Sequence, residues 1–156
     1  MNWLQFGVQW LHVLLGITWF GYALSIYFFV TPAVVALPEP AQRDAWGRLG
    51  TLAARVLPGL AKLVVVLGIL RGTVFGPISS LEDLFGTAYG VTWLVALIVT
   101  IGLVVHGARF LGPATVTLRD APDFEKAAAR VRRLATADLA GFAVVFTCMI
   151  LMRFGL

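Results

Sequence analysis

Charged residues are scarce in this chain, and so are the side-chain arrangements that soluble enzymes use at their active sites. Only 13% of the 156 residues are charged, whereas 60% are hydrophobic, and the mean hydropathy of +0.90 exceeds that of ordinary soluble domains. The sequence contains no glycine-rich phosphate loop, no paired catalytic carboxylates and no Ser/His/Asp arrangement. These absences argue against common soluble enzyme classes and indicate that a bilayer is the solvent.

Cysteine is nearly absent, and the positive charge does not indicate nucleic acid. The single cysteine, Cys148, excludes an internal disulfide framework and a cysteine-rich metal site. The isoelectric point of about 9.8 invites a nucleic-acid interpretation, but membrane topology and anionic lipid headgroups account for the basic residues. We therefore expect membrane lipid as a partner and no nucleic acid.

Four apolar runs fill the chain. A transmembrane helix needs about 20 apolar residues, and Pro32, Pro77 and Pro113 follow the first three runs as breakers. The sequence thus predicts an all-α fold, an integral membrane bundle of four transmembrane helices forming one domain, 1–156. The helices are expected at about 3–31, 56–75, 88–111 and 123–154.

Basic residues predict the orientation, because cytoplasmic loops are enriched in Lys and Arg. On the side where both chain termini are expected, the only basic residues are Arg71 and Arg153. The loop on that side carries the acidic residues Glu82 and Asp83. We therefore expect a multi-pass protein of the inner (plasma) membrane, with both termini extracytoplasmic and loops 1–2 and 3–4 cytoplasmic. The basic residues on the cytoplasmic side are Arg43, Arg48, Arg55, Arg109, Arg119, Lys126, Arg130, Arg132 and Arg133.

Both histidines lie inside apolar runs, where an imidazole is costly and usually marks a haem, a metal or a proton path. His12 lies on the first helix and His106 on the third. With a rise of about 1.5 Å per residue, the two rings differ in depth by roughly 12 Å. One haem clamped between them is therefore geometrically awkward, and two separate sites are expected.

The outer site is centred on His12. Gly16 and Trp19 follow it on the same helix face, and the glycine leaves space beside the imidazole for a flat ring. Arg71 lies at a similar depth and suits a haem propionate. Met149 or Met152 is a candidate second axial ligand, although methionine in such a stripe is more often packing. The candidate cofactor-binding residues are His12, Gly16, Trp19, Arg71, Met149, Met152 and His106, with His12 and His106 as iron ligands.

The inner site gathers polar residues near the cytoplasmic boundary. One interpretation is a hydrogen-bonded network that pins the third helix to the fourth; the alternatives for the histidine are a haem ligand or a proton relay. Lys62 either snorkels towards the interface or faces the bundle as a functional ammonium. The members of the expected cluster are His106, Arg109, Asp138 and Arg55.

Several short motifs resemble known families. Trp10-Leu11-His12-Val13, followed by Gly16, Trp19 and Phe20-Gly21, is similar to the first helix of the copper-resistance D (CopD) group and of HemJ-type protoporphyrinogen oxidases. Arg55-Val-Leu-Pro58-Gly59 with Gly68, and the helix ending in His106 with Arg109, also resemble HemJ-type helices. The resemblance implies a small membrane haem b protein with His12 as an axial ligand.

The resemblance has two departures. HemJ-type enzymes carry a lysine near the outer start of the third helix, where this chain has Val91, Thr92 and Trp93, which argues against porphyrinogen oxidation. CopD-type proteins suggest copper, but the chain has no Met-rich or His-rich motif.

The leading hypothesis is a haem b redox protein, a haem-dependent oxidoreductase in its broadest description, that exchanges electrons with a quinone or a small oxidant. A cofactor-free accessory subunit of a larger membrane complex, or a homo-oligomer, is the first alternative. The GxxxG pairs Gly68/Gly72 and Gly86/Gly90 favour such close packing. A small proton, ion or copper transporter using His106, Asp138 and Lys62 is the second alternative.

Overall fold

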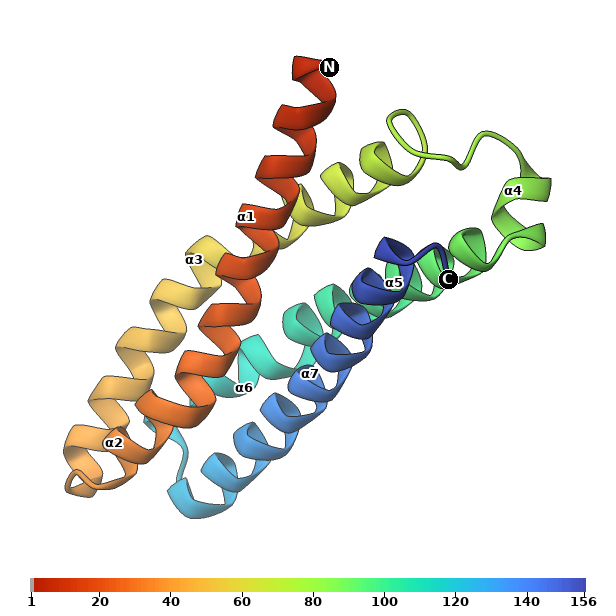
Figure 1. Cartoon of the computed structure of the whole chain (residues 1–156). Coiled ribbons are helices and arrows are strands. Elements are labelled where there is room, and N and C mark those ends of the chain that lie inside the picture. Colours follow the sequence, from red (N-terminus) through yellow and green to blue (C-terminus); the bar gives the residue numbers. More distant parts are fainter. Residues whose placement is uncertain (1) are drawn as a thin grey trace.

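The computed structural model describes residues 2–156, which form an all-helical bundle with no strand in that range (Figure 1). Four helical stretches, Trp3–Val35, Glu39–Gly72, Ala88–Asp120 and Phe124–Arg153, are long and apolar enough to cross a membrane. The prediction of an all-α chain with four membrane-length helices is therefore confirmed. The elements are α1 (Trp3–Ser25), η1 (Ile26–Val30), α2 (Thr31–Val35), α3 (Glu39–Gly72), α4 (Leu81–Gly86), α5 (Ala88–His106), η2 (Gly107–Leu111), α6 (Gly112–Thr117), η3 (Leu118–Asp120) and α7 (Phe124–Arg153).

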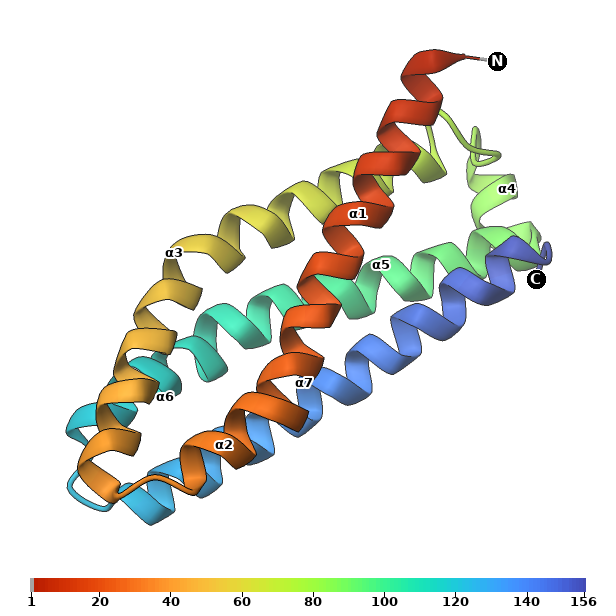
Figure 2. The same cartoon turned by 60° about the vertical axis from the view of Figure 1, so that its left-hand side comes forward.

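The chain forms two helical hairpins that lie side by side. α1 packs chiefly on α3 and α5 chiefly on α7, while α3 also packs on α5 and α6. Figures 1 and 2 show both chain termini and α4 at one end of the bundle, hereafter the terminal end. The short connections at 36–38 and 121–123 lie at the opposite end, hereafter the connection end.

α3 begins at Glu39, well before the apolar run that predicted its start near residue 56. The added turns are amphipathic, so an apolar run cannot reveal them. Pro38 and Pro40 stand where a helix tolerates proline best. Two ion pairs at helical spacing support this segment, Glu39 with Arg43 at 2.7 Å and Asp44 with Arg48 at 2.8 Å.

The first and third helices also run past the prolines expected to end them. A π-helical turn, η1 or η2, stands immediately before Thr31-Pro32 and Gly112-Pro113. Proline in a regular α-helix clashes with the carbonyl four residues earlier, and the wider turn accommodates the ring. Both sites share the pattern Phe-x-x-Pro-Ala, at 29–33 and 110–114. The first helices of the two hairpins thus share a π-helical turn at the same five-residue pattern.

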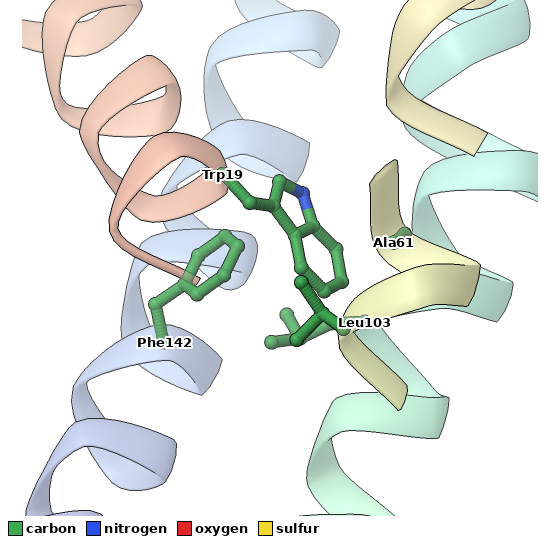
Figure 3. Close-up of a cluster of buried hydrophobic side chains, with 5 residues drawn as sticks. Trp19, Ala61, Leu103 and Phe142 are labelled. Atoms are coloured by element: carbon green, nitrogen blue, oxygen red, sulfur yellow. The ribbon is translucent and has the colours of Figure 1, made fainter. Parts of the chain in front are cut away.

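A buried cluster at the middle of the bundle joins all four long helices (Figure 3). Trp19 of α1 meets Phe142 of α7 edge to face, with ring centroids 5.0 Å apart. Leu103 of α5 and Ala61 of α3 complete the contact. The helices approach closely here, because a Cβ at Gly141 would lie 2.7 Å from Leu103 Cδ2.

A second buried cluster closes the connection end. Its members are Val34, Trp46, Leu118, Phe124 and Val131, and Leu118 is only 1% exposed. Most other large apolar side chains point outward, for example Ile17 at 64% and Phe29 at 73% exposed. Such an exposed apolar surface suits lipid rather than water.

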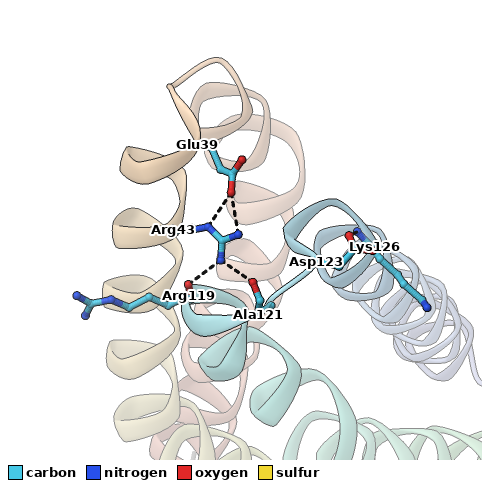
Figure 4. A network of polar contacts seen from close by, with 6 residues as sticks. All are labelled: Glu39, Arg43, Arg119, Ala121, Asp123 and Lys126. Atoms are coloured by element: carbon cyan, nitrogen blue, oxygen red, sulfur yellow. Dashed lines mark hydrogen bonds and ion pairs between the residues drawn. The ribbon is translucent and has the colours of Figure 1, made fainter.

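Arg43 fastens α3 to the second hairpin at the connection end (Figure 4). Its guanidinium donates to the carbonyl oxygens of Arg119 at 3.0 Å and Ala121 at 2.7 Å. It also pairs with Glu39 and lies 4.8 Å over the ring of Phe124. One side chain thus satisfies carbonyls that the end of η3 leaves without helical partners.

We expect Arg43→Ala to lower the free energy of unfolding by about 1–3 kcal/mol, because two carbonyls lose a charged donor. Thermal unfolding in detergent, followed by circular dichroism, measures this. Arg43→Lys should recover only part of the loss, since an ammonium cannot reproduce the planar fork. An Arg43→Ala variant that melts with the wild type would show that the network is not formed.

The short helix α4 is fixed by a capping box at its start. Ser80 accepts from the Asp83 backbone N–H at 3.0 Å, while the Asp83 carboxylate accepts from Ser79 and Ser80. Two hydrogen bonds from Ser79 hold the pKa of Asp83 below its ordinary value. The one from the Ser79 side chain has the larger effect, and the one from its backbone N–H comes second. A lowered pKa stabilises the folded state above the unfolded pKa, so this cap weakens as the pH falls through the folded pKa.

Candidate functional site

Polar side chains of α1 and α3 meet at the terminal end. The Arg71 guanidinium, near the end of α3, donates through Nε to the side-chain oxygen of Gln9. Arg71 also donates to the Phe75 carbonyl at 3.0 Å, and Gln5 donates to the same oxygen at 3.1 Å. Gln5, Gln9 and His12 follow one face of α1. We call Gln5, Gln9, His12 and Arg71 the terminal-end polar cluster.

His12 is held against the backbone of α3. Its Nδ1 lies 3.1 Å from the Val64 carbonyl oxygen, and a carbonyl only accepts, so Nδ1 carries the proton. In a neutral imidazole the lone pair is then on Nε2, which is the state that binds a metal. Nε2 has no hydrogen-bond partner among residues 2–156. The fold therefore orients this ring and leaves one nitrogen available.

The Gly68/Gly72 pair receives side chains of two neighbouring helices. A Cβ at Gly68 would lie 3.0 Å from Cε1 of His12, and one at Gly72 would overlap the indole of Trp93. Trp93 also donates through Nε1 to the Gly68 carbonyl at 3.4 Å. The close packing expected from this GxxxG pair is thus a groove on α3 that holds an imidazole from α1 and an indole from α5.

The other expected cofactor residues are spread over the bundle. A Cβ at Gly16 meets no atom within 4 Å, so the space beside it is open. Trp19 is buried in the central cluster. On α7, Cys148 is the buried residue at the terminal end, while Met149 is 37% exposed and Met152 is half-buried. The inward stripe of α7 therefore passes through Cys148, and Met149 lies at its edge.

The second histidine forms a hydrogen bond with an aspartate that joins α5 to α7. His106 Nδ1 lies 2.7 Å from Asp138 Oδ1, and the two side chains are 24% and 15% exposed. The ring of Phe110 lies 5.7 Å from that of His106. This pair is the contact that the sequence predicted between the third and fourth helices.

The two arginines expected in that cluster lie elsewhere. Arg109 is exposed, and within the described range neither Arg109 nor Arg55 forms an ion pair with Asp138. Arg55 instead lines a groove with Arg48 and Arg119. The inner cluster is therefore a His/Asp pair without a guanidinium.

A large cavity opens between the helices on the connection-end side of the central cluster. Its volume of about 1700 Å³ exceeds that of most small-molecule sites. Trp19 and Phe142 of the central cluster line it, and its largely apolar wall also contains the charged residues Glu39, Lys62, Asp123, Glu125, Lys126, Arg132 and Asp138. Lys62 thus borders the cavity, and its side chain is exposed.

Both π-helical turns border this cavity, through Ile26 and Tyr27 of η1 and Gly107, Ala108 and Leu111 of η2. Single π-helical turns occur frequently at functional sites. The π-helical turns were not predicted from the sequence; the signal that could have revealed them is the repeated Phe-x-x-Pro-Ala pattern.

No cluster of three or more His, Cys, Asp or Glu side chains that could hold a metal ion occurs within residues 2–156. Each of the two candidate sites therefore contains one histidine, His12 or His106. Comparison of the chain with protein-family models, with curated proteins and with solved structures finds no match.

Proposed function

We propose that the protein is a membrane-embedded haem b redox protein in which Nε2 of His12 is an axial ligand. The observation that carries this proposal is the 3.1 Å hydrogen bond from Nδ1 to the Val64 carbonyl. Such a bond is the usual second partner of a metal-bound histidine, because it fixes the tautomer and the ring direction. The resemblance of the first helix to CopD-type and HemJ-type proteins leads to the same residue.

The neighbouring donor set fits a haem. Arg71 offers a guanidinium for a propionate, and Gln9 holds it in place through Nε. Gly16 lies about one turn from His12, and a Cβ added there would meet no atom within 4 Å. A bound haem would supply one-electron chemistry with a quinone or a small oxidant. The chain itself orients the imidazole and supplies a positive charge within an apolar environment.

The visible spectrum of the purified protein tests this proposal. We expect a Soret band after expression with ample haem, and we expect His12→Ala to abolish it. His106→Ala is the matched control, since it also removes a half-buried imidazole on another helix, and it should leave the band in place. A wild-type protein without a Soret band, or a band that survives His12→Ala, would overturn the proposal.

We also infer that the connection end faces the cytoplasm of the inner membrane, with both termini outside. Arg43, Arg48 and Arg119 lie at the connection end, whereas Glu82 and Asp83 lie at the terminal end. The bias in basic residues is the usual determinant of orientation.

Labelling of single cysteines measures the orientation. In a Cys148→Ser background, we expect Glu82→Cys to react with a membrane-impermeant maleimide in intact cells and Asp120→Cys to react only after lysis. Both positions are exposed, so access is decided by the membrane alone. The reverse pattern would contradict the inferred orientation.

A second candidate function is proton or ion transfer through the connection-end cavity. The observation that favours it is the His106–Asp138 pair at 2.7 Å, whose carboxylate borders the cavity together with Lys62. Intramembrane ionisable groups beside a cavity commonly mark such paths. Proton flux in liposomes that Asp138→Asn abolishes, without any Soret band in the wild type, would favour this function over haem binding.

A further inference from the structure

A small groove at the connection end, apart from both histidines, concentrates positive charge. Its volume is about 260 Å³, and its walls are Gly47, Arg48, Thr51, Leu52 and Arg55 of α3 with Arg119 of η3. We propose that this arginine groove binds the phosphate of an anionic phospholipid headgroup. The proposal is independent of haem binding, since no residue of the terminal-end polar cluster takes part.

The charges in the groove are largely uncompensated. Arg48 pairs with Asp44 at 2.8 Å, one turn away on the same helix. Arg55 and Arg119 form no ion pair within the range that the structure describes. Guanidinium groups bind phosphate oxygens through paired hydrogen bonds, which makes arginine the preferred residue for this anion. Two free guanidinium groups at one concave site therefore indicate an anionic ligand with several oxygens.

The fold positions Arg119 against α3. A Cβ at Gly47 would lie 2.9 Å from Cδ of Arg119 and 3.3 Å from its Cβ, so the absence of a side chain at Gly47 lets the arginine stem lie against the helix. The backbone is fixed as well, because Arg43 donates to the Arg119 carbonyl at 3.0 Å. The groove is thus formed by packing between α3 and η3, and a side chain at position 47 would disturb it.

The location of the groove favours a lipid over free phosphate. Arg55 is the last charged residue before the apolar run of α3 that starts at Val56. Leu52 and Val56 are 61% and 54% exposed and offer an apolar surface beside the arginines. A phospholipid whose phosphate lies in the groove would therefore place its acyl chains along this surface. Basic pockets at this depth, beside the ends of membrane helices, are typical sites for anionic headgroups.

Native mass spectrometry of the detergent-solubilised protein tests the proposal with phosphatidylglycerol as the probe and phosphatidylcholine as the zwitterionic reference. We expect the wild type to retain phosphatidylglycerol preferentially. Arg55→Gln/Arg119→Gln should lower its affinity about thirtyfold, since each of the two arginines near a membrane surface contributes about 1 kcal/mol. Arg130→Gln/Arg133→Gln removes the same charge from exposed positions of α7 and should keep the lipid.

Gly47→Leu separates geometry from charge, because it displaces Arg119 without altering the net charge. We expect it to lower phosphatidylglycerol occupancy as the arginine pair does, with an unchanged circular dichroism spectrum as the check on folding. If the two double variants lose phosphatidylglycerol equally, net charge alone explains the binding, and the proposed site is overturned. Complete displacement of the lipid by millimolar inorganic phosphate would overturn the lipid assignment in favour of a free phosphate site.

Discussion

Gly72→Ala should destabilise the terminal end of the bundle more than any other glycine-to-alanine change on α3. A Cβ at this position would overlap the indole of Trp93, and the ring cannot retreat without giving up its hydrogen bond to the Gly68 carbonyl. Overpacking of this kind costs about 1–3 kcal/mol or more. The midpoint of thermal unfolding in detergent, measured by circular dichroism, should fall accordingly.

Two comparisons make this prediction specific. Gly16→Ala is the matched control, since no atom lies within 4 Å of its Cβ, and it should leave the midpoint nearly unchanged. Trp93→Ala removes the overlapping atoms, so the double variant with Gly72→Ala should be more stable than the sum of the single changes implies. If Gly72→Ala and Gly16→Ala unfold at the same temperature, the indole does not occupy the groove on α3.

Asp138→Ala should lower the free energy of unfolding by about 1–3 kcal/mol, because it leaves His106 Nδ1 half-buried without a partner. Asp138→Asn keeps an oxygen within reach of that nitrogen and should restore part of the stability. The same thermal measurement decides the outcome.

Arg109→Ala is the informative control for this pair. The sequence placed Arg109 in one cluster with His106 and Asp138, but the exposed guanidinium forms no ion pair with them. We therefore expect Arg109→Ala to change the stability little. A loss equal to that of Asp138→Ala would contradict the arrangement of α5 and α7, and so would an Asp138→Ala variant that melts with the wild type.

The four spans and the His106–Asp138 contact could be predicted because both depend on one-dimensional information. Apolar runs reveal membrane-length helices, and depth along a helix follows from residue number. The position of a side chain around its helix is harder to infer, which is why Arg109 and Arg55 were expected beside Asp138. The side chain of Arg109 is exposed at the surface, and that of Arg55 lines the arginine groove.

The environment of His12 could not be predicted from residue types. Its partner is the backbone carbonyl of Val64, and a backbone acceptor has no sequence signature. The GxxxG pair did indicate close approach, but a glycine accommodates a helix, an imidazole or an indole equally well. The start of α3 was placed too late for a related reason, since its first turns are amphipathic and apolar content alone defined the span.

The repeated π-helical turns show what a short motif can conceal. Proline after a long apolar run normally indicates a helix end, and Pro32 and Pro113 were interpreted in this way. In both hairpins the widened turn carries the helix past the proline, and the residues of that turn border the cavity. A rule based on proline alone therefore shortens these two helices and misses the cavity wall.

Chemical rescue of the first histidine tests the proposed haem ligation most directly. In His12→Gly, the removed side chain leaves room for free imidazole, which can supply the missing nitrogen. The proposal predicts that the Soret band is lost in this variant and returns when imidazole is added. A Soret band that is the same in His12→Gly and in the wild type, with or without imidazole, would contradict it.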